Sequence, residues 1–131
     1  MRDLPAVACG LARVVRPGGR IAICTIGRFC AWESVYYACR LQFRKAFRRL
    51  RGSAPSSLGT AFYPTISQLQ SVFAPEFTLL RWSGIGLLVP PSYVRLPDSV
   101  VRFCGWLDRE LFRLPLLRAM ADHRLLILVR K

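Results

Sequence analysis

A Pro-Gly-Gly turn between two apolar segments, at residues 14–26, most constrains what this chain can fold into. Pro17 cannot continue a helix, and Gly18 and Gly19 can adopt the positive φ values that other residues avoid. The run from Ile21 to Ile26 is short, nearly all apolar and partly β-branched. Such a run is typical of a strand covered on both faces, as in a parallel α/β sheet. The stretch therefore predicts the end of a helix, a tight turn and a buried strand.

The hydrophobic pattern predicts further helices and strands along the chain. We expect helices at residues 3–15, 31–50, 66–73 and 98–114, and strands at residues 20–26, 77–85 and 124–130. Asp3 and Thr65 are the expected N-caps of the first and third helices. Residues 52–64 are expected to form a loop and residues 87–97 an irregular segment. The predicted fold class is α/β, with fewer strands than a doubly wound sheet usually has.

The length of 131 residues allows one domain at most. No run is long and apolar enough to predict a transmembrane helix, and the N-terminal segment lacks the pattern of a signal peptide. Five cysteines without a C-x-x-C pair, and His123 as the one histidine, make a structural zinc site improbable and favour a reduced compartment. We therefore expect a cytoplasmic chain without a metal site, in which Cys24 is a small buried side chain.

The net charge of +13 comes almost wholly from arginine. One interpretation is a set of arginines dispersed over solvated surface, and the other is a surface that binds a polyanion. The predicted helix 31–50 carries the densest cluster, at Arg40, Arg44, Lys45, Arg48, Arg49 and Arg51. Its apolar residues recur at helical spacing, at Trp32, Tyr36, Cys39, Phe43, Phe47 and Leu50. An amphipathic helix of this kind indicates either a covered helix with a solvated basic edge, or a basic module Arg40–Arg51 that binds nucleic acid or an anionic membrane.

Three segments, taken in their order and spacing, carry a resemblance to a known family. They are Leu11-Ala12-Arg13-Val14-Val15-Arg16-Pro17-Gly18-Gly19-Arg20-Ile21, Phe73-Ala74-Pro75-Glu76-Phe77-Thr78, and residues 122–131 with the sequence DHRLLILVRK. The chain resembles the C-terminal half of class I S-adenosylmethionine-dependent methyltransferases. The resemblance implies that the first segment is the helix, turn and start of strand five of that family. It also implies that the second segment enters strand six and that the third is the antiparallel last strand.

The resemblance implies S-adenosylmethionine as the cofactor of the complete fold. In that family a glycine-rich loop after strand one and an acidic residue ending strand two hold the cofactor, and this sequence contains neither. Its G-x-G, Gly84-Ile85-Gly86, leads to Pro90-Pro91 and not to a helix N-terminus. We therefore expect residues 1–131 to form a single partial domain with an incomplete Rossmann-like methyltransferase sheet. Such a truncated chain is expected to bind no cofactor alone and to be inactive alone.

In an open α/β sheet, ligands bind beyond the carboxyl ends of the strands. In the family this end of strand five faces the methyl acceptor, which makes Thr25, Gly27, Arg28, Trp32, Glu33, Tyr36 and Tyr63 the candidate acceptor-binding residues. Trp32, Tyr36, Phe62, Tyr63 and Tyr93 are the aromatic residues that could form a wall for a small or lipid-like acceptor. Trp32 and Tyr36 also suit a helix core, and Glu33 also suits an exposed first-turn carboxylate. No residue is singled out as catalytic.

The edge of strand 20–26 that would meet strand four of the family has no partner in this sequence. An apolar strand edge without a partner pairs, exchanges or aggregates. We therefore expect either a missing half of the fold or a second copy of the chain to cover this edge.

Overall fold

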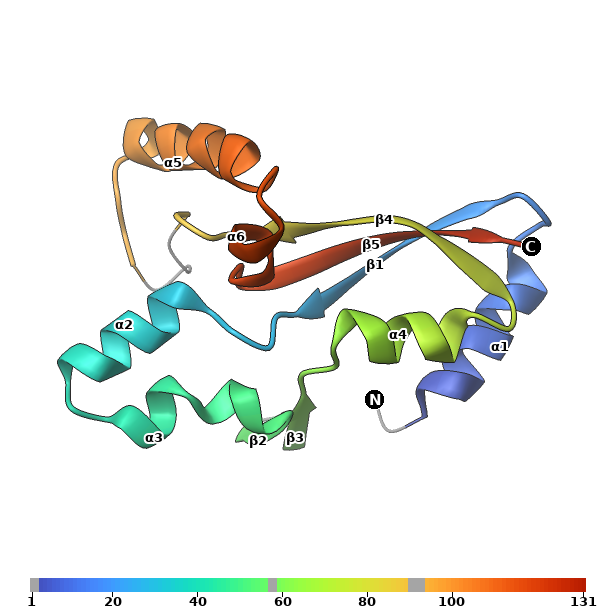
Figure 1. Cartoon of the computed structure of the whole chain (residues 1–131), viewed down its shortest axis with the longest axis horizontal. Helices are drawn as coiled ribbons and strands as arrows, with labels where there is room; N and C mark the ends of the chain where they lie inside the picture. The colour runs from blue at the N-terminus through green and yellow to red at the C-terminus, as the bar shows by residue number, and fades with distance from the viewer. Residues whose placement is uncertain (1–2, 57–58, 90–93) are drawn as a thin grey trace.

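Three long strands form the sheet around which the chain is arranged (Figure 1). A computed structural model describes residues 3–56, 59–89 and 94–131. The strands are β1 (Arg20–Ile26), β2 (Ser53–Ser56), β3 (Gly59–Phe62), β4 (Phe77–Ile85) and β5 (His123–Arg130). The helices are α1 (Leu4–Val14), α2 (Ala31–Cys39), α3 (Phe43–Ala46), α4 (Ile66–Phe73), α5 (Asp98–Leu111) and α6 (Pro115–Ala119), with a 3-10 helix η1 (Arg48–Arg51).

The main sheet has the order β1-β5-β4, and β5 is antiparallel to both of its neighbours. The three predicted strands are confirmed, and β5 begins one residue earlier than expected, at His123. The antiparallel direction of the last strand is also confirmed. The expectation of parallel pairing is wrong, because both pairings in this sheet are antiparallel. β1 and β4 nevertheless run in the same direction, since each is antiparallel to β5. The fold class is mixed α/β, with an antiparallel three-stranded sheet and flanking helices.

The Pro-Gly-Gly turn joins α1 to β1 and is fastened to the end of β5. Asp3 caps α1 as predicted, because its side chain accepts a hydrogen bond from the amide of Ala6. Gly18 has a φ of 73°, a conformation that side chains disfavour. The Gly18 amide donates to the Arg130 carbonyl at 3.0 Å, and the Arg130 amide donates to the Gly19 carbonyl at 2.8 Å. These two bonds set the start of β1 against the last residues of β5.

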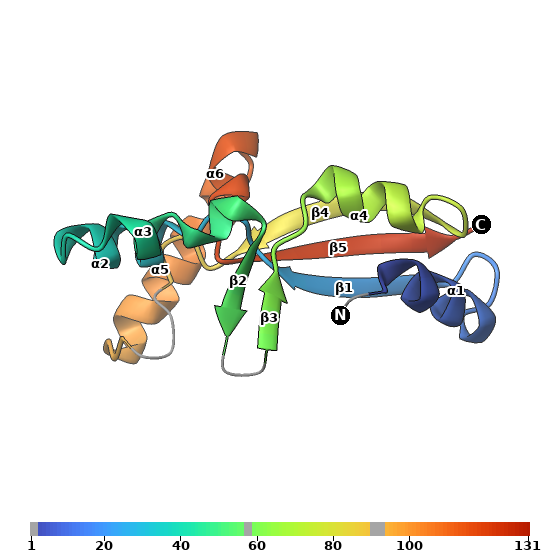
Figure 2. The same ribbon diagram turned by 90° about the horizontal axis from the view of Figure 1, so that it is seen from below.

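The core lies between one face of the sheet and the helices α1 and α4. Figures 1 and 2 show the two helices side by side on that face. The largest of the almost completely buried side chains are Leu69, Phe73, Phe77, Leu126 and Leu128. Thr65 caps α4 as predicted and forms a reciprocal capping box with Gln68. The predicted helices 3–15 and 66–73 are thus confirmed, and each buries its apolar side against the sheet.

The opposite face of the sheet is open along β1. Ala22, Cys24 and Ile26 are exposed, whereas Ile21 and Ile23 are half-buried against the core. The prediction of a strand covered on both faces is therefore wrong. The expectation that Cys24 is buried is wrong for the same reason, because its side chain points away from α1 and α4.

The predicted long helix 31–50 is also wrong, because the chain leaves the helix after Cys39. Leu41 has a φ of 57°, in the left-handed region that a leucine side chain disfavours. The chain then forms α3 and η1, so the expected apolar stripe and basic face do not lie along one helix. Phe43, Phe47 and Leu50 are about half exposed, at 56%, 47% and 48%. Much of this segment is helical, but it does not form the single continuous helix that the pattern predicted.

Two further predictions need correction at this end of the molecule. The expected loop 52–64 contains the antiparallel hairpin β2–β3, which follows Gly52 at a φ of 83°. The predicted helix 98–114 is present as α5 but ends at Leu111, and the apolar residues Val100, Phe103 and Leu114, which helical spacing places on one face, are exposed. The irregular segment 87–97 contains no helix or strand where it is described, and residues 90–93, including Tyr93, lie outside the described residues.

Candidate functional site

Most segments outside the core gather beyond one end of the sheet. In Figure 1 the arrows of β1 and β4 point to this end, and α2, α3 and α5 lie beyond it. Figure 2 shows the β2–β3 hairpin on the same side of the molecule. The carboxyl ends of β1 and β4 therefore meet the part of the chain in which the sequence placed the candidate acceptor site.

Gly27 directly follows β1, at a position that only glycine fits. Its amide donates to the Asp122 carbonyl at 2.6 Å. A Cβ at this position would lie 2.3 Å from the Ala121 carbonyl oxygen, far inside van der Waals contact. The bond fastens the end of β1 to the turn that leads into β5, and so fixes the direction in which residues 28–30 leave the sheet.

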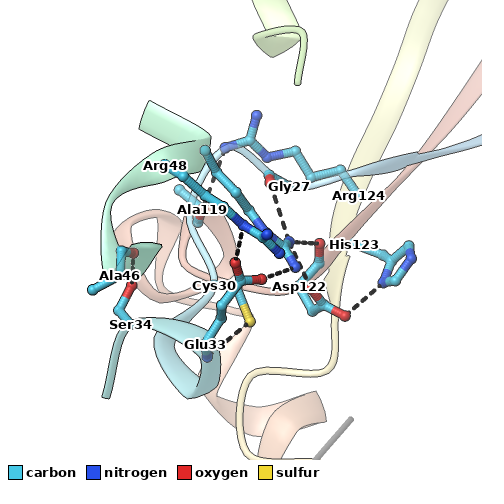
Figure 3. A network of polar contacts seen from close by, with 11 residues as sticks. Gly27, Cys30, Glu33, Ser34, Ala46, Arg48, Ala119, Asp122, His123 and Arg124 are labelled. Atoms are coloured by element: carbon cyan, nitrogen blue, oxygen red, sulfur yellow. Dashed lines mark hydrogen bonds and ion pairs between the residues drawn. The ribbon is translucent and has the colours of Figure 1, made fainter. Parts of the chain in front are cut away.

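Arg49 links three segments at this end of the sheet, in the network drawn in Figure 3. Its Nη2 lies 2.5 Å from Oε2 of Glu33, and its Nη1 lies 2.7 Å from Oδ1 of Asp122. The other oxygen of Glu33 lies 2.7 Å from Nε of Arg48, and the other oxygen of Asp122 lies 3.1 Å from Nδ1 of His123. The network ties η1 to α2 and to the turn before β5.

Glu33 is 5% exposed, so the expectation of an exposed first-turn carboxylate is wrong. Burial alone would lower the pKa of the Arg49 guanidinium, but its hydrogen bond to Asp122 and the charge of Glu33 raise the pKa above its ordinary value. Both oxygens of Glu33 are engaged by guanidinium groups. This arrangement positions α2 and η1, and it leaves the carboxylate without a free oxygen for proton transfer.

Cys30 lies inside the same cluster. Its sulfur accepts a hydrogen bond from the Glu33 amide at 3.5 Å and caps the start of α2. Burial raises the pKa of the Cys30 thiol to about 11. A thiol held protonated in this way is a poor nucleophile, so Cys30 serves the structure at this site.

The two candidate aromatic residues of α2 make contacts of their own. Nε1 of Trp32 donates to the Leu88 carbonyl at 3.0 Å, which ties α2 to the segment after β4. Tyr36 is 37% exposed and carries the guanidinium of Arg40 at 4.3 Å from its ring centre. Trp32 is thus partly buried, and the alternative that Tyr36 belongs to a helix core is wrong.

A cavity of about 830 Å³ lies beside the carboxyl end of β1. Its wall contains Arg28 and Tyr63 from the candidate set, together with Arg51. Its apolar lining comes from α1, the end of β3, the segment after β3 and α4, through Leu4, Pro5, Phe62, Tyr63, Pro64 and Val72. Nε and Nη2 of Arg28 both donate to the Leu50 carbonyl, at 3.3 and 3.2 Å, which orients this side chain along η1.

The structure thus divides the seven candidates. Arg28 and Tyr63 line the cavity, Gly27 and Glu33 belong to the strand-end network, and Thr25, Trp32 and Tyr36 are not among the described residues that line the cavity. The Thr25 hydroxyl is buried with no hydrogen-bond partner in the described part of the chain.

Sequence reasoning did not assign Arg51, Asp122 or Arg124 to this site. Arg124 is buried, and its guanidinium donates to the carbonyls of Pro64 and Ala119. Burial and the nearby charge of Arg28 lower the pKa of Arg124. One feature of the sequence could have indicated that Arg124 is buried. Because side chains alternate between the two faces of a strand, Arg124 lies on the same covered face as Leu126 and Leu128.

The chain was compared with known protein families and with curated proteins, and neither comparison returned a match. No cluster of three or more His, Cys, Asp or Glu side chains that could hold a metal occurs among the described residues. In the same residues, no helix is long and apolar enough to cross a membrane.

Proposed function

We propose that this chain forms the acceptor-side part of a class I S-adenosylmethionine-dependent methyltransferase fold, acting on a small or lipid-like acceptor. The observation that carries the proposal is the direction of the three strands. The sequence resemblance matches β1 to strand five, β4 to strand six and β5 to the antiparallel last strand. In the structure β1 and β4 run together and β5 is antiparallel to both, as the matched segments require.

The uncovered parts of the sheet support a Rossmann-like sheet that is completed by further strands and helices. β1 pairs only with β5 among the described strands, so its other edge is open. On the face away from α1 and α4, Ala22 and Cys24 are exposed next to their partners Ile127 and Leu125. An open edge beside an apolar face is a surface that another strand and its helices would cover.

The residues present do not fit the cofactor. The G-x-G segment Gly84-Ile85-Gly86 is followed by amides that already have a partner, because Leu87, Leu88 and Val89 donate to the carboxylate of Asp108 at 3.1, 2.8 and 3.4 Å. These amides are not available to an anionic cofactor tail. We therefore place the cofactor site on the part of the fold that covers β1, and we assign no step of the reaction to this chain's residues.

The test is calorimetry with S-adenosylmethionine on two samples. One is this chain, and the other is this chain joined to the segment encoded directly upstream of it. We expect binding, and transfer of a labelled methyl group, only in the joined protein. Tight binding by this chain alone would contradict the placement of the cofactor site. A joined, folded protein that binds no S-adenosylmethionine would contradict the methyltransferase proposal itself.

The alternative of a basic module that binds nucleic acid or an anionic membrane has less support. Arg48 and Arg49 are ion-paired with the buried Glu33, Arg49 is also paired with Asp122, and Arg40 stacks on Tyr36. The remaining charges of Arg40–Arg51 are divided between the two short helices α3 and η1. Binding to a DNA duplex that weakens steeply between low and high salt would favour this alternative.

A further inference from the structure

The cavity beside β1 has the size and lining of a small-molecule site. Its volume of about 830 Å³ falls within the roughly 300–1,000 Å³ of known ligand pockets. The side chains of Phe62, Pro64 and Val72 supply apolar surface on the side of β3 and α4. A ligand that fills this space would therefore have an apolar body.

The charged groups of this cavity all have one sign. Arg28 and Arg51 lie in its wall, and no Asp or Glu is among the described residues that line it. Arg51 makes no ion pair with any described residue, whereas Arg48 and Arg49 beside it are both paired. Arg124 does not line the cavity, but its guanidinium is close enough to Arg28 for their charges to interact. Positive groups gathered at an apolar cavity favour an anionic ligand.

We propose that this cavity binds a small organic acid, with its carboxylate at Arg28 and Arg51 and its apolar body against Phe62 and Val72. A guanidinium binds a carboxylate with paired, charge-assisted hydrogen bonds, which suits a single acidic group. The apolar part of the wall disfavours a polyanion, because some of its further charges would lie against Leu4, Phe62 and Val72. If the proposed function is right, on which this last step rests, the acid is the methyl acceptor.

The experiment measures binding to this chain of 2-naphthoate and of its neutral analogue 2-naphthamide by calorimetry. We expect 2-naphthoate to bind about tenfold or more tightly than the amide, the preference that one charge-assisted contact provides. Arg51→Gln should remove most of this preference and leave binding of the amide unchanged. Arg44→Gln makes the same charge change on an exposed residue outside the cavity, and it should leave both affinities unchanged.

A second variant tests the position of the ligand's apolar body. Ser71 is an exposed residue of α4 that lines the cavity, so Ser71→Trp should fill the space without disturbing the core. We expect this variant to bind neither compound. A parallel titration with decanoate distinguishes the two kinds of acid, since a planar acceptor site favours naphthoate and a lipid-like site favours decanoate.

Three results would overturn the inference: equal affinity for naphthoate and naphthamide, no binding of any acid, or equal losses from Arg51→Gln and Arg44→Gln. These results are separate from the test of the proposed function. Selective binding of the acid would stand even if no assembly bound S-adenosylmethionine. A methyltransferase assembly that preferred neutral acceptors would contradict the inference and leave the proposed function in place.

Discussion

Two regions of this molecule are held together by different forces. The helices α1 and α4 are packed against the sheet by apolar side chains, and Phe73 and Leu126 are at most 2% exposed. The segment from Gly27 to Arg51 has the opposite arrangement. Its buried side chains include Glu33 and Ser34, whereas Phe43 and Phe47 lie at the surface. The first region has a hydrophobic core, and the second is fastened by ion pairs and hydrogen bonds.

The difference shows that an apolar pattern predicts burial only where a surface is present to cover it. The apolar side chains of α1 and α4 lie against β5 and are buried there. In residues 31–50, α2 lies against α3, but Phe43, Phe47 and Leu50 stay about half exposed. Ion pairs join η1 to α2 and help to fix the position of this segment.

The largest expected effect on stability comes from the hydrophobic core of the first region. Phe73→Ala removes a buried ring from the contact with Phe77, 6.0 Å between ring centres, and should lower the free energy of unfolding by about 4 kcal/mol. Phe47→Ala deletes the same ring from the surface of the second region and should cost about 1 kcal/mol. Urea denaturation of both variants measures the two losses. Equal losses would mean that Phe47 is covered, and the distinction between the regions would then fail.

The next largest expected effect on stability comes from the ion pairs of the second region. Arg49→Met leaves the carboxylates of Glu33 and Asp122 without the guanidinium that they share. This change should lower the free energy of unfolding by about 3 kcal/mol. Arg44→Met, at an exposed position of α3, should change stability by no more than about 0.5 kcal/mol. The measurement is again urea denaturation.

A double variant identifies the cause of that loss. Adding Glu33→Gln to Arg49→Met removes the charge of one of the two carboxylates that have lost Arg49, so the double variant should be more stable than the sum of the single losses predicts. If the losses simply added, the ion pair would not be what holds η1 to α2.

Much of the fold was predictable from local patterns. The strands β1, β4 and β5 and the helices α1 and α4 were predicted within a residue or so, because each combines a clear periodicity with a cap or a turn residue such as Asp3, Pro17 or Thr65. The antiparallel last strand came from the resemblance and not from periodicity. The break after Cys39 was not predictable, since Leu41 in a left-handed conformation has no signature in the sequence.

The candidate site was predictable only in its location. The carboxyl end of β1 was the expected place, and Arg28 and Tyr63 do line the cavity there. The partners of Glu33 could not be predicted, because Arg49 and Asp122 come from distant segments that meet only when η1 folds back on α2. Helical spacing placed Arg49 on the basic edge of one long helix, whereas the folded chain buries it between two carboxylates.

The smallest expected effect is a difference between two cysteines, one exposed on the sheet and one buried in the polar cluster. Cys24 is exposed on the open face of β1, and Cys30 is buried in the polar cluster. Because burial raises the Cys30 pKa from 9.0 to about 11, the folded chain keeps this proton at pH values where an unfolded chain has lost it. The Cys30 contribution to stability should therefore be full below pH 9 and decrease as the pH rises toward about 11.

Iodoacetamide at pH 8, read by peptide mass spectrometry, should modify Cys24 rapidly and Cys30 only after denaturation. Equal rates in the folded chain would show that the cluster around Glu33 is open to solvent, and rapid labelling of neither residue would show that the open face of β1 is covered.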